Sequence, residues 1–279
     1  MNTTDMSSAK EIQCRLSRDG SPVAGRIYSS TKLLAGPSSL KIATVAHPYG
    51  PLGGSFDDPT VLLIVKTLLS SGYDVVGTFN FRRPSWTLKP EIADFSAFSL
   101  FLMLYGRLMS DSRERSIHML AAGYSYGSLV ASQVPALSRI LGQGSQDAAF
   151  LLEQAIGIVQ RQDRTSSALT TTVDSMLSDA AMSTSYLLVS PILSPTTNLV
   201  APFNRSQSFL GRIDSSSERC SALAIFGDKD AFTGSHRLEA WAGDNNVEYQ
   251  TVQEAGHFWQ IPEHQRQLSN AVSKWVGTL

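Results

Sequence analysis

Short apolar runs alternate with longer stretches of helical periodicity along most of this chain. The apolar runs have the length of buried strands, and the stretches between them carry apolar residues at helical spacing. The first such strands cover residues 39–48, 73–81 and 116–124, with helices over 59–71 and 95–109. Strands that alternate with helices in this way predict an α/β fold, with a mostly parallel sheet and helices on both of its faces.

The first of these helices has recognisable signals at both ends. Asp58 is a preferred N-cap residue, Pro59 suits the first helical position, and Gly72 is typical of the position that follows a helix. Upstream, residues 11–34 alternate weakly around the turn sequence SRDGSP, which predicts an antiparallel hairpin.

The alternation is interrupted between residues 142 and 184. This segment is rich in Ser, Thr, Gln and Ala but contains an amphipathic stretch at 148–160 and a second candidate helix at 173–182, so we interpret it as an inserted helical cap. Strands and helices then resume; the strands cover 185–193, 220–230 and 247–259, and the helices 235–243 and 263–276. We therefore expect one domain, residues 1–279, that contains the cap.

Charge gives no indication of a polyanionic partner. The chain has 23 basic and 24 acidic residues, a net charge of −1, and no long block of like charge, which argues against nucleic acid and favours a small-molecule substrate. The apolar run 95–109 is shorter than the roughly 20 residues that span a bilayer. Because Gly106 and Arg107 interrupt it, we interpret it as a helix packed on the sheet and expect no stable membrane insertion.

Two further features favour a cytoplasmic protein. Cys14 and Cys220 match no metal or redox spacing, and we expect them to be small buried thiols. The polar residues 1–10 lack the pattern of a signal peptide. The sequence leaves the oligomeric state open, including a homo-oligomer.

Ser125 lies where a strand meets a helix, between Gly123 and Gly127. A nucleophile at such a turn occupies strained backbone, and side chains two residues to either side would collide with the neighbouring strand and helix. The same turn directs the amide of Tyr126 toward the site, where it can stabilise a developing oxyanion. We therefore interpret Ser125 as a nucleophile rather than as a small turn residue.

A serine hydroxyl needs a base to accept its proton, and that base needs a carboxylate. His257 follows the last strand and is the candidate base. Asp230 is favoured as the carboxylate because it lies further into its loop than Asp228, which we expect to hold the turn by accepting bonds from nearby amides. Glu254 is a remote third candidate. The remaining histidines fit less well: a buried strand position, His118, and two helical positions expected to be solvated, His236 and His264.

Acyl transfer also needs amide donors for the oxyanion. The loop HPYGPLGG, residues 47–54, follows the first parallel strand, and its Gly and Pro content suits a backbone that faces a ligand. The amides of Tyr49 and Tyr126 are the candidate donors. Alternatively, this is only a tight loop that leads to the Asp58 cap.

Five ordered segments, HPYGPLGGS, FNFR, GYSYG, GDKD and EAGHF, together resemble the α/β-hydrolase family. The resemblance extends from about residue 38 to the end, excluding the insert, and is closest to small predicted hydrolases, of which fungal members look most similar. It implies that Ser125, Asp230 and His257 are nucleophile, acid and base, and that the amides of Tyr49 and Tyr126 bind the oxyanion.

The chain departs from that pattern after FNFR. Family members usually continue with a glycine-rich turn, whereas this chain continues with RRPSWTLKPE, residues 82–91, near the mouth of the expected site. Arg83 and Trp86 either line the entrance or are ordinary surface residues. The change puts in doubt any substrate transferred from relatives.

These observations favour a serine hydrolase that cleaves an ester, thioester or related acyl bond and needs no metal or organic cofactor. The altered loop and the long cap motivate an alternative, a biosynthetic enzyme of secondary metabolism that cleaves a carbon–carbon bond or cyclises a polyketide-like substrate. A third reading is a non-catalytic binding protein on the same fold. In the cap, Phe150, Leu151 and Ile156 could line a pocket or pack in the core.

Overall fold

The computed structural model describes residues 10–18, 21–29, 39–82, 84–110, 116–142, 145–161, 181–201 and 220–279. Within these ranges the chain forms one eight-stranded sheet in the order β1-β2-β4-β3-β5-β6-β7-β8. Strands β1 and β2 form the expected antiparallel hairpin and β2 is antiparallel to β4, whereas all pairs from β4 to β8 are parallel. The predicted α/β class is confirmed.

The strands are β1 (Lys10–Arg18), β2 (Ser21–Ser29), β3 (Ser39–Ala46), β4 (Val75–Phe79), β5 (Ser116–Tyr124), β6 (Met182–Val189), β7 (Ser221–Gly227) and β8 (Glu248–Val252). The helices are α1 (Pro59–Ser70), α2 (Lys89–Met109), α3 (Tyr126–Ala131), α4 (Leu137–Gly142), α5 (Ser145–Gln160), α7 (Thr196–Val200), α8 (Ser235–Asp244) and α9 (Pro262–Val276).

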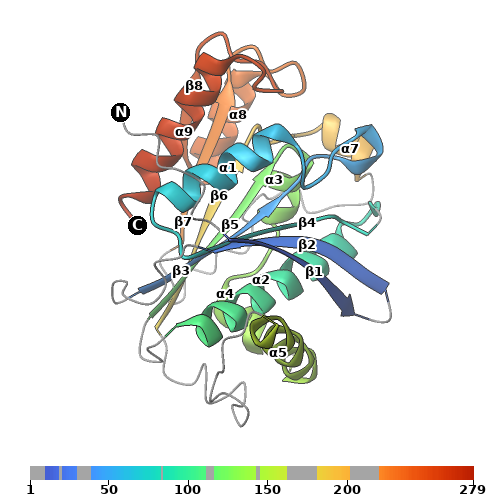
Figure 1. Cartoon of the computed structure of the whole chain (residues 1–279). Helices are drawn as coiled ribbons and strands as arrows, with labels where there is room; N and C mark the ends of the chain where they lie inside the picture. Colours follow the sequence, from blue (N-terminus) through green and yellow to red (C-terminus); the bar gives the residue numbers. More distant parts are fainter. Residues whose placement is uncertain are drawn as a thin grey trace.

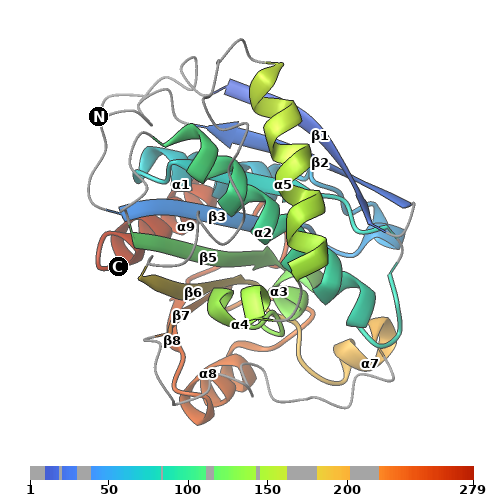
Figure 2. The same cartoon turned by 90° about the horizontal axis from the view of Figure 1, so that it is seen from below.

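Helices cover both faces of the sheet (Figure 1). Helices α1 and α9 pack together on one face, over a core cluster that includes Val61, Leu68, Leu268 and Trp275. Figure 2 shows the opposite face, where α2, α3, α4, α5 and α8 lie. Their apolar side chains join a second core cluster with the inner faces of β1 and β2. The sheet is therefore buried on both sides, as its apolar strands require.

The ends of α1 follow the predicted signals. Asp58 Oδ1 accepts hydrogen bonds from the amides of Thr60 (2.8 Å) and Val61 (3.4 Å), which have no partner within the helix. Pro59 is the first helical residue, and Gly72 follows the helix with a φ of 92°, a left-handed conformation that suits glycine.

Helix α2 is longer than predicted. It begins at Lys89 rather than Phe95, and its first turn carries Pro90 and the buried Glu91, which is a common composition for a helix start. Among the described helices, α2 alone is long and apolar enough to cross a membrane, and 72% of its most apolar stretch is buried inside the structure. It packs against β3, β4 and α5, in agreement with a helix packed on a sheet.

The predicted insert, 142–184, is described only in part. Its first half forms α5, which packs against α2 and β1, and its last residues belong to β6. Leu151 is buried in the core cluster, Ile156 packs against that cluster, and Phe150 is 42% exposed. Most of the second candidate helix, 173–182, lies outside the described residues, so a cap over the site stays a prediction.

Three predictions about single residues have different outcomes. Cys14 is buried, and burial raises the pKa of its thiol to about 12; Cys220 is half-buried and forms no disulfide with it. His236 is exposed, as expected. The prediction that His264 is solvated is wrong: His264 is 7% exposed, because it continues the buried stripe of α9 one turn before Leu268.

His118 is a buried strand histidine, as expected. Its Nδ1 lies 2.9 Å from Ser183 Oγ, and burial, together with the charge of Lys41, lowers its pKa from 6.5 to about 4. The folded protein therefore keeps this imidazole neutral below pH 6.5, where the unfolded chain takes up a proton. The contribution of His118 to the free energy of unfolding is therefore present above pH 6.5. It is lost as the pH falls toward 4, and a pKa shift of this size corresponds to about 3 kcal/mol.

We therefore expect His118→Gln to flatten the acid dependence of stability. Between pH 7 and pH 4.5, the urea-unfolding free energy of the variant should fall by about 2 kcal/mol less than that of the wild type. His236→Gln, at an exposed site, is the control and should lose as much stability as the wild type. An equal loss of unfolding free energy in His118→Gln and in the wild type would contradict the lowered pKa of His118.

Candidate active site

The turn after β5 holds Ser125 in a conformation that few residues adopt. Its φ is 56° and its ψ −119°, and α3 begins at the next residue. A Cβ on Gly123 would lie 2.1 Å from the carbonyl oxygen of Gly127, and one on Gly127 would lie 2.4 Å from the carbonyl oxygen of Ala46. Only glycine permits this close approach of three backbone segments, as the sequence predicted.

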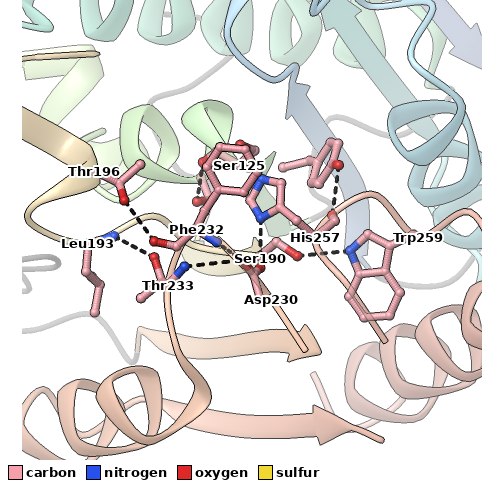
Figure 3. Close-up of polar contacts among 11 residues, drawn as sticks. Ser125, Ser190, Leu193, Thr196, Asp230, Phe232, Thr233, His257 and Trp259 are labelled. Carbon is pink, nitrogen blue, oxygen red and sulfur yellow. Dashed lines mark hydrogen bonds and ion pairs between the residues drawn. The ribbon is translucent and has the colours of Figure 1, made fainter. Parts of the chain in front are cut away.

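The structure brings Ser125, His257 and Asp230 together in one hydrogen-bonded chain (Figure 3). His257 Nε2 lies 2.8 Å from Ser125 Oγ, and His257 Nδ1 lies 2.7 Å from Asp230 Oδ2. The three residues follow β5, β8 and β7, so they meet at the carboxyl edge of the sheet. All three are buried, at 9%, 4% and 6% exposure respectively.

The two aspartates of the loop after β7 make different contacts. Asp230 Oδ1 accepts hydrogen bonds from the amides of Phe232 (2.8 Å) and Thr233 (3.2 Å), which leaves Oδ2 directed at His257. Asp228 Oδ1 instead accepts the amide of Glu254 at 2.7 Å and so holds the adjacent turn, as expected. The carboxylate of Glu254 is 74% exposed and lies 3.7 Å from Lys229 Nζ, so it takes no part in the chain.

Aromatic side chains surround the His257 imidazole. The ring of Phe232 lies 4.3 Å from it and that of Phe258 lies 5.4 Å from it, centroid to centroid. The Tyr124 hydroxyl donates a 2.9 Å hydrogen bond to the His257 carbonyl, and burial raises the pKa of that hydroxyl. The Trp259 indole donates to Ser190 Oγ at 3.0 Å, which fixes the chain beyond the histidine (Figure 3). The imidazole is therefore restrained on several sides.

This arrangement suits proton transfer from Ser125. A carboxylate oxygen can only accept, so the Asp230 contact favours the His257 tautomer that carries its proton on Nδ1. Nε2 is then a lone-pair acceptor that faces the Ser125 hydroxyl. The geometry can make Ser125 Oγ a nucleophile and stabilise the imidazolium that results.

The residues predicted to donate to an oxyanion lie next to each other. The rings of Tyr49 and Tyr126 are 5.1 Å apart in an edge-on contact. Tyr126 is the first residue of α3, and the Tyr49 carbonyl accepts the amides of Leu52 and Gly54, both at 3.1 Å, in the turn Gly50–Leu52. The donor role of the two amides stays a prediction.

The sequence analysis missed the part that His47 plays in this loop. Its Nε2 accepts the amide of Phe81 at 3.0 Å, so Nδ1 carries the proton and donates to the Pro48 carbonyl at 2.5 Å. Burial lowers the pKa of His47 to about 4, which keeps it neutral. The signal was present, since a histidine directly after a buried strand begins the HPYGPLGG loop.

The loop between β4 and α2 is anchored to the start of α2. The Arg82 guanidinium binds both oxygens of the buried Asp94, and Ser85 binds the buried Glu91. Trp86 is 63% exposed, and Arg83 lies outside the described residues. An entrance role for Trp86 stays a prediction.

Comparison with known proteins gives one relative by sequence and many by structure. No protein-family model matches the chain. An uncharacterized protein of Schizosaccharomyces pombe is 34% identical over 93 residues, which are 33% of this chain and 39% of that protein. The match thus spans well under half of the length of this relative.

Solved structures match over almost the whole chain. An α/β serine hydrolase homologue from Coxiella burnetii has a TM-score of 0.57 and 13% identity, covering 94% of this chain and 96% of that one. An α/β serine hydrolase without a lid from Xanthomonas campestris has a TM-score of 0.57 and 18% identity, covering 96% and 94%. The esterase Pf2001 of Pyrococcus furiosus has a TM-score of 0.55 and 16% identity, covering 100% and 96%. The chain therefore has the α/β-hydrolase fold.

Proposed function

We propose that this protein is a serine hydrolase that cleaves an ester, thioester or related acyl bond of a small molecule. The observation that carries the proposal is the buried hydrogen-bonded chain from Ser125 through His257 to Asp230, at a turn that holds Ser125 at a φ of 56°. Proteins of the same fold that are named as serine hydrolases or esterases support it.

The reaction proceeds in two halves. In the first, Ser125 Oγ attacks the acyl carbon, its proton passes to His257 Nε2, and the amides of Tyr126 and Tyr49 stabilise the oxyanion. Collapse of this tetrahedral intermediate expels the leaving group, which takes the proton from His257. The acyl group then remains as an ester on Ser125. In the second half, water gives a proton to His257 and attacks that ester; His257 then returns the proton to Ser125 Oγ as the bond to the acyl carbon breaks, which releases the acid.

Asp230 supports both halves through His257. Its Oδ2 holds the imidazole in the productive tautomer and stabilises the positive charge that forms on it twice per turnover. The two amides that bind Oδ1 keep this carboxylate from turning away. The low exposure of the pair strengthens the interaction because little water competes for it.

Labelling with a fluorophosphonate tests the nucleophile. We expect the wild type to gain one adduct by intact mass and Ser125→Ala to gain none, because the reagent reacts with an activated serine hydroxyl. Ser132→Ala is the matched control: Ser132 is also buried, but its hydroxyl binds the Leu129 carbonyl, so labelling should persist. A wild-type adduct that survives in Ser125→Ala, or no adduct and no hydrolysis of a panel of aryl esters and thioesters, would refute the proposal.

The two aspartates provide a second test. Asp230→Asn should lower kcat for an aryl ester by about 10³ to 10⁴-fold, since an asparagine in its place can stabilise the wrong tautomer of His257. Asp228→Asn should stay within about twofold of the wild type, because its carbonyl oxygen can still accept the Glu254 amide. Steady-state kinetics on both variants, with products identified as the acid and the alcohol or thiol, provide the check. Similar kcat values for the two variants would contradict the assignment of the acid.

A further inference from the structure

A buried carboxylate outside the Ser125–His257–Asp230 chain contacts the residue that follows Ser125. Glu91, in the first turn of α2, is 1% exposed. Its Oε1 accepts the hydroxyl of Tyr126 at 2.8 Å and the amide of Ser85, and its Oε2 accepts the Ser85 hydroxyl at 2.6 Å. Three donors from two separate segments thus meet on one carboxylate.

Such a carboxylate is costly to bury, and its hydrogen bonds offset that cost only while their geometry is kept. The Tyr126 hydroxyl therefore has a strong preference for one position. Burial and the nearby charge of Glu91 both raise the pKa of Tyr126, so its hydroxyl keeps the proton that it donates. The side chain of Tyr126 is therefore held in place at its hydroxyl end.

The ring of Tyr126 also contacts Tyr49, the other residue whose amide is a proposed oxyanion donor. It makes an edge-on contact with Tyr49 at 5.1 Å and a perpendicular contact with Phe81 at 5.7 Å. Phe81 in turn donates its amide to His47, the residue that begins the Tyr49 loop. A single anchored ring thus lies between the turn at Ser125 and the loop at Tyr49.

The orientation of the Tyr126 amide depends on two torsions, ψ of Ser125 and φ of Tyr126. The first is set by the strained turn, with ψ at −119°. A change in φ of Tyr126 moves the Tyr126 side chain. A ring that is held in place therefore restrains this torsion. A small rotation of this peptide plane would misdirect the donor, and oxyanion donors contribute only at short distance and good angle.

We propose that Glu91 is a positioning residue: by holding the Tyr126 hydroxyl, it keeps the amide of Tyr126 and the packed Tyr49 loop aligned with the oxyanion that forms during acyl transfer. This inference rests on the proposed function. Glu91 does not touch the substrate and acts only through Tyr126. Ser85 couples the loop between β4 and α2 to the same carboxylate.

The test compares ground-state and transition-state interactions in variants of this contact. Tyr126→Phe removes the hydroxyl but keeps the ring contacts, and Glu91→Leu removes the acceptor. Glu91→Gln is the conservative variant, because its carbonyl oxygen can still accept from Tyr126 and its amide can donate to Ser85 Oγ. The measurements are kcat and KM for an aryl ester and Ki for a trifluoromethyl ketone, whose adduct with Ser125 carries an oxyanion. Active sites are counted by fluorophosphonate labelling, so that unfolded protein does not contribute.

We expect Tyr126→Phe to lower kcat about tenfold with KM within about twofold, and to raise Ki for the ketone by the same factor as kcat/KM falls. Glu91→Leu should lower kcat at least as much as Tyr126→Phe does, and Glu91→Gln should keep most of the wild-type kcat. Tyr186→Phe is the matched control: it also loses a buried tyrosine hydroxyl, bound to the Val134 carbonyl at 3.0 Å, and should leave kcat and Ki unchanged.

An active wild type with kcat and Ki unchanged in Tyr126→Phe would overturn the positioning role and leave the proposed function intact. A loss of activity in Tyr126→Phe without a matching rise in Ki would do the same, because the defect would then lie outside the oxyanion. If Glu91→Leu does not fold, the comparison of Tyr126→Phe with Glu91→Gln decides the matter. A wild type that neither reacts with the fluorophosphonate nor hydrolyses esters would refute the proposed function and this inference together.

Discussion

The close packing of three backbone segments at the end of β5 is the constraint on which the site depends. Gly123 lies against Gly127, and Gly127 lies against the carbonyls of Ala46 and His47, with no room for a Cβ at either glycine. This contact forces Ser125 into its positive φ. It also sets the start of the loop that carries Tyr49 directly beside the Ser125 turn, because β3 and β5 are neighbours in the sheet. The geometry of the proposed nucleophile and that of its proposed oxyanion donors therefore have one origin.

The candidate site contains several buried polar side chains. His47, Glu91, Asp230 and His257 are all less than a tenth exposed, and each has a hydrogen bond to a residue of another segment. Buried polar groups of this kind cost free energy unless their partners are kept in place. In return they fix loops that a purely apolar core would leave free to shift. Among the described residues, the loops at the carboxyl edge of the sheet are thus tied together by hydrogen bonds.

Sequence reasoning could predict the contacts that local rules decide, and it could not predict those that tertiary packing decides. Ser125, Asp230 and His257 could be predicted because strand ends of a parallel sheet meet at one edge, and Asp230 could be separated from Asp228 by its place in the turn. The contact of Glu91 with Tyr126 joins residues 35 positions apart and depends on how α2 crosses the sheet. The strand order, with β4 outside β3, and the burial of His264 are likewise set by tertiary contacts, although the spacing of His264 from Leu268 was a usable signal.

The proposed function requires that Ser125 carries the acyl group during turnover. The most direct test is to quench the protein during hydrolysis of an aryl ester, whose good leaving group lets the covalent intermediate accumulate, and to map the protein by mass spectrometry. If Ser125 is the nucleophile, the peptide that contains it should gain the mass of the acyl group, and this gain should be absent when the ester is omitted. Turnover that proceeds with no acylated peptide, or with the acyl group on another residue, would contradict the proposed role of Ser125.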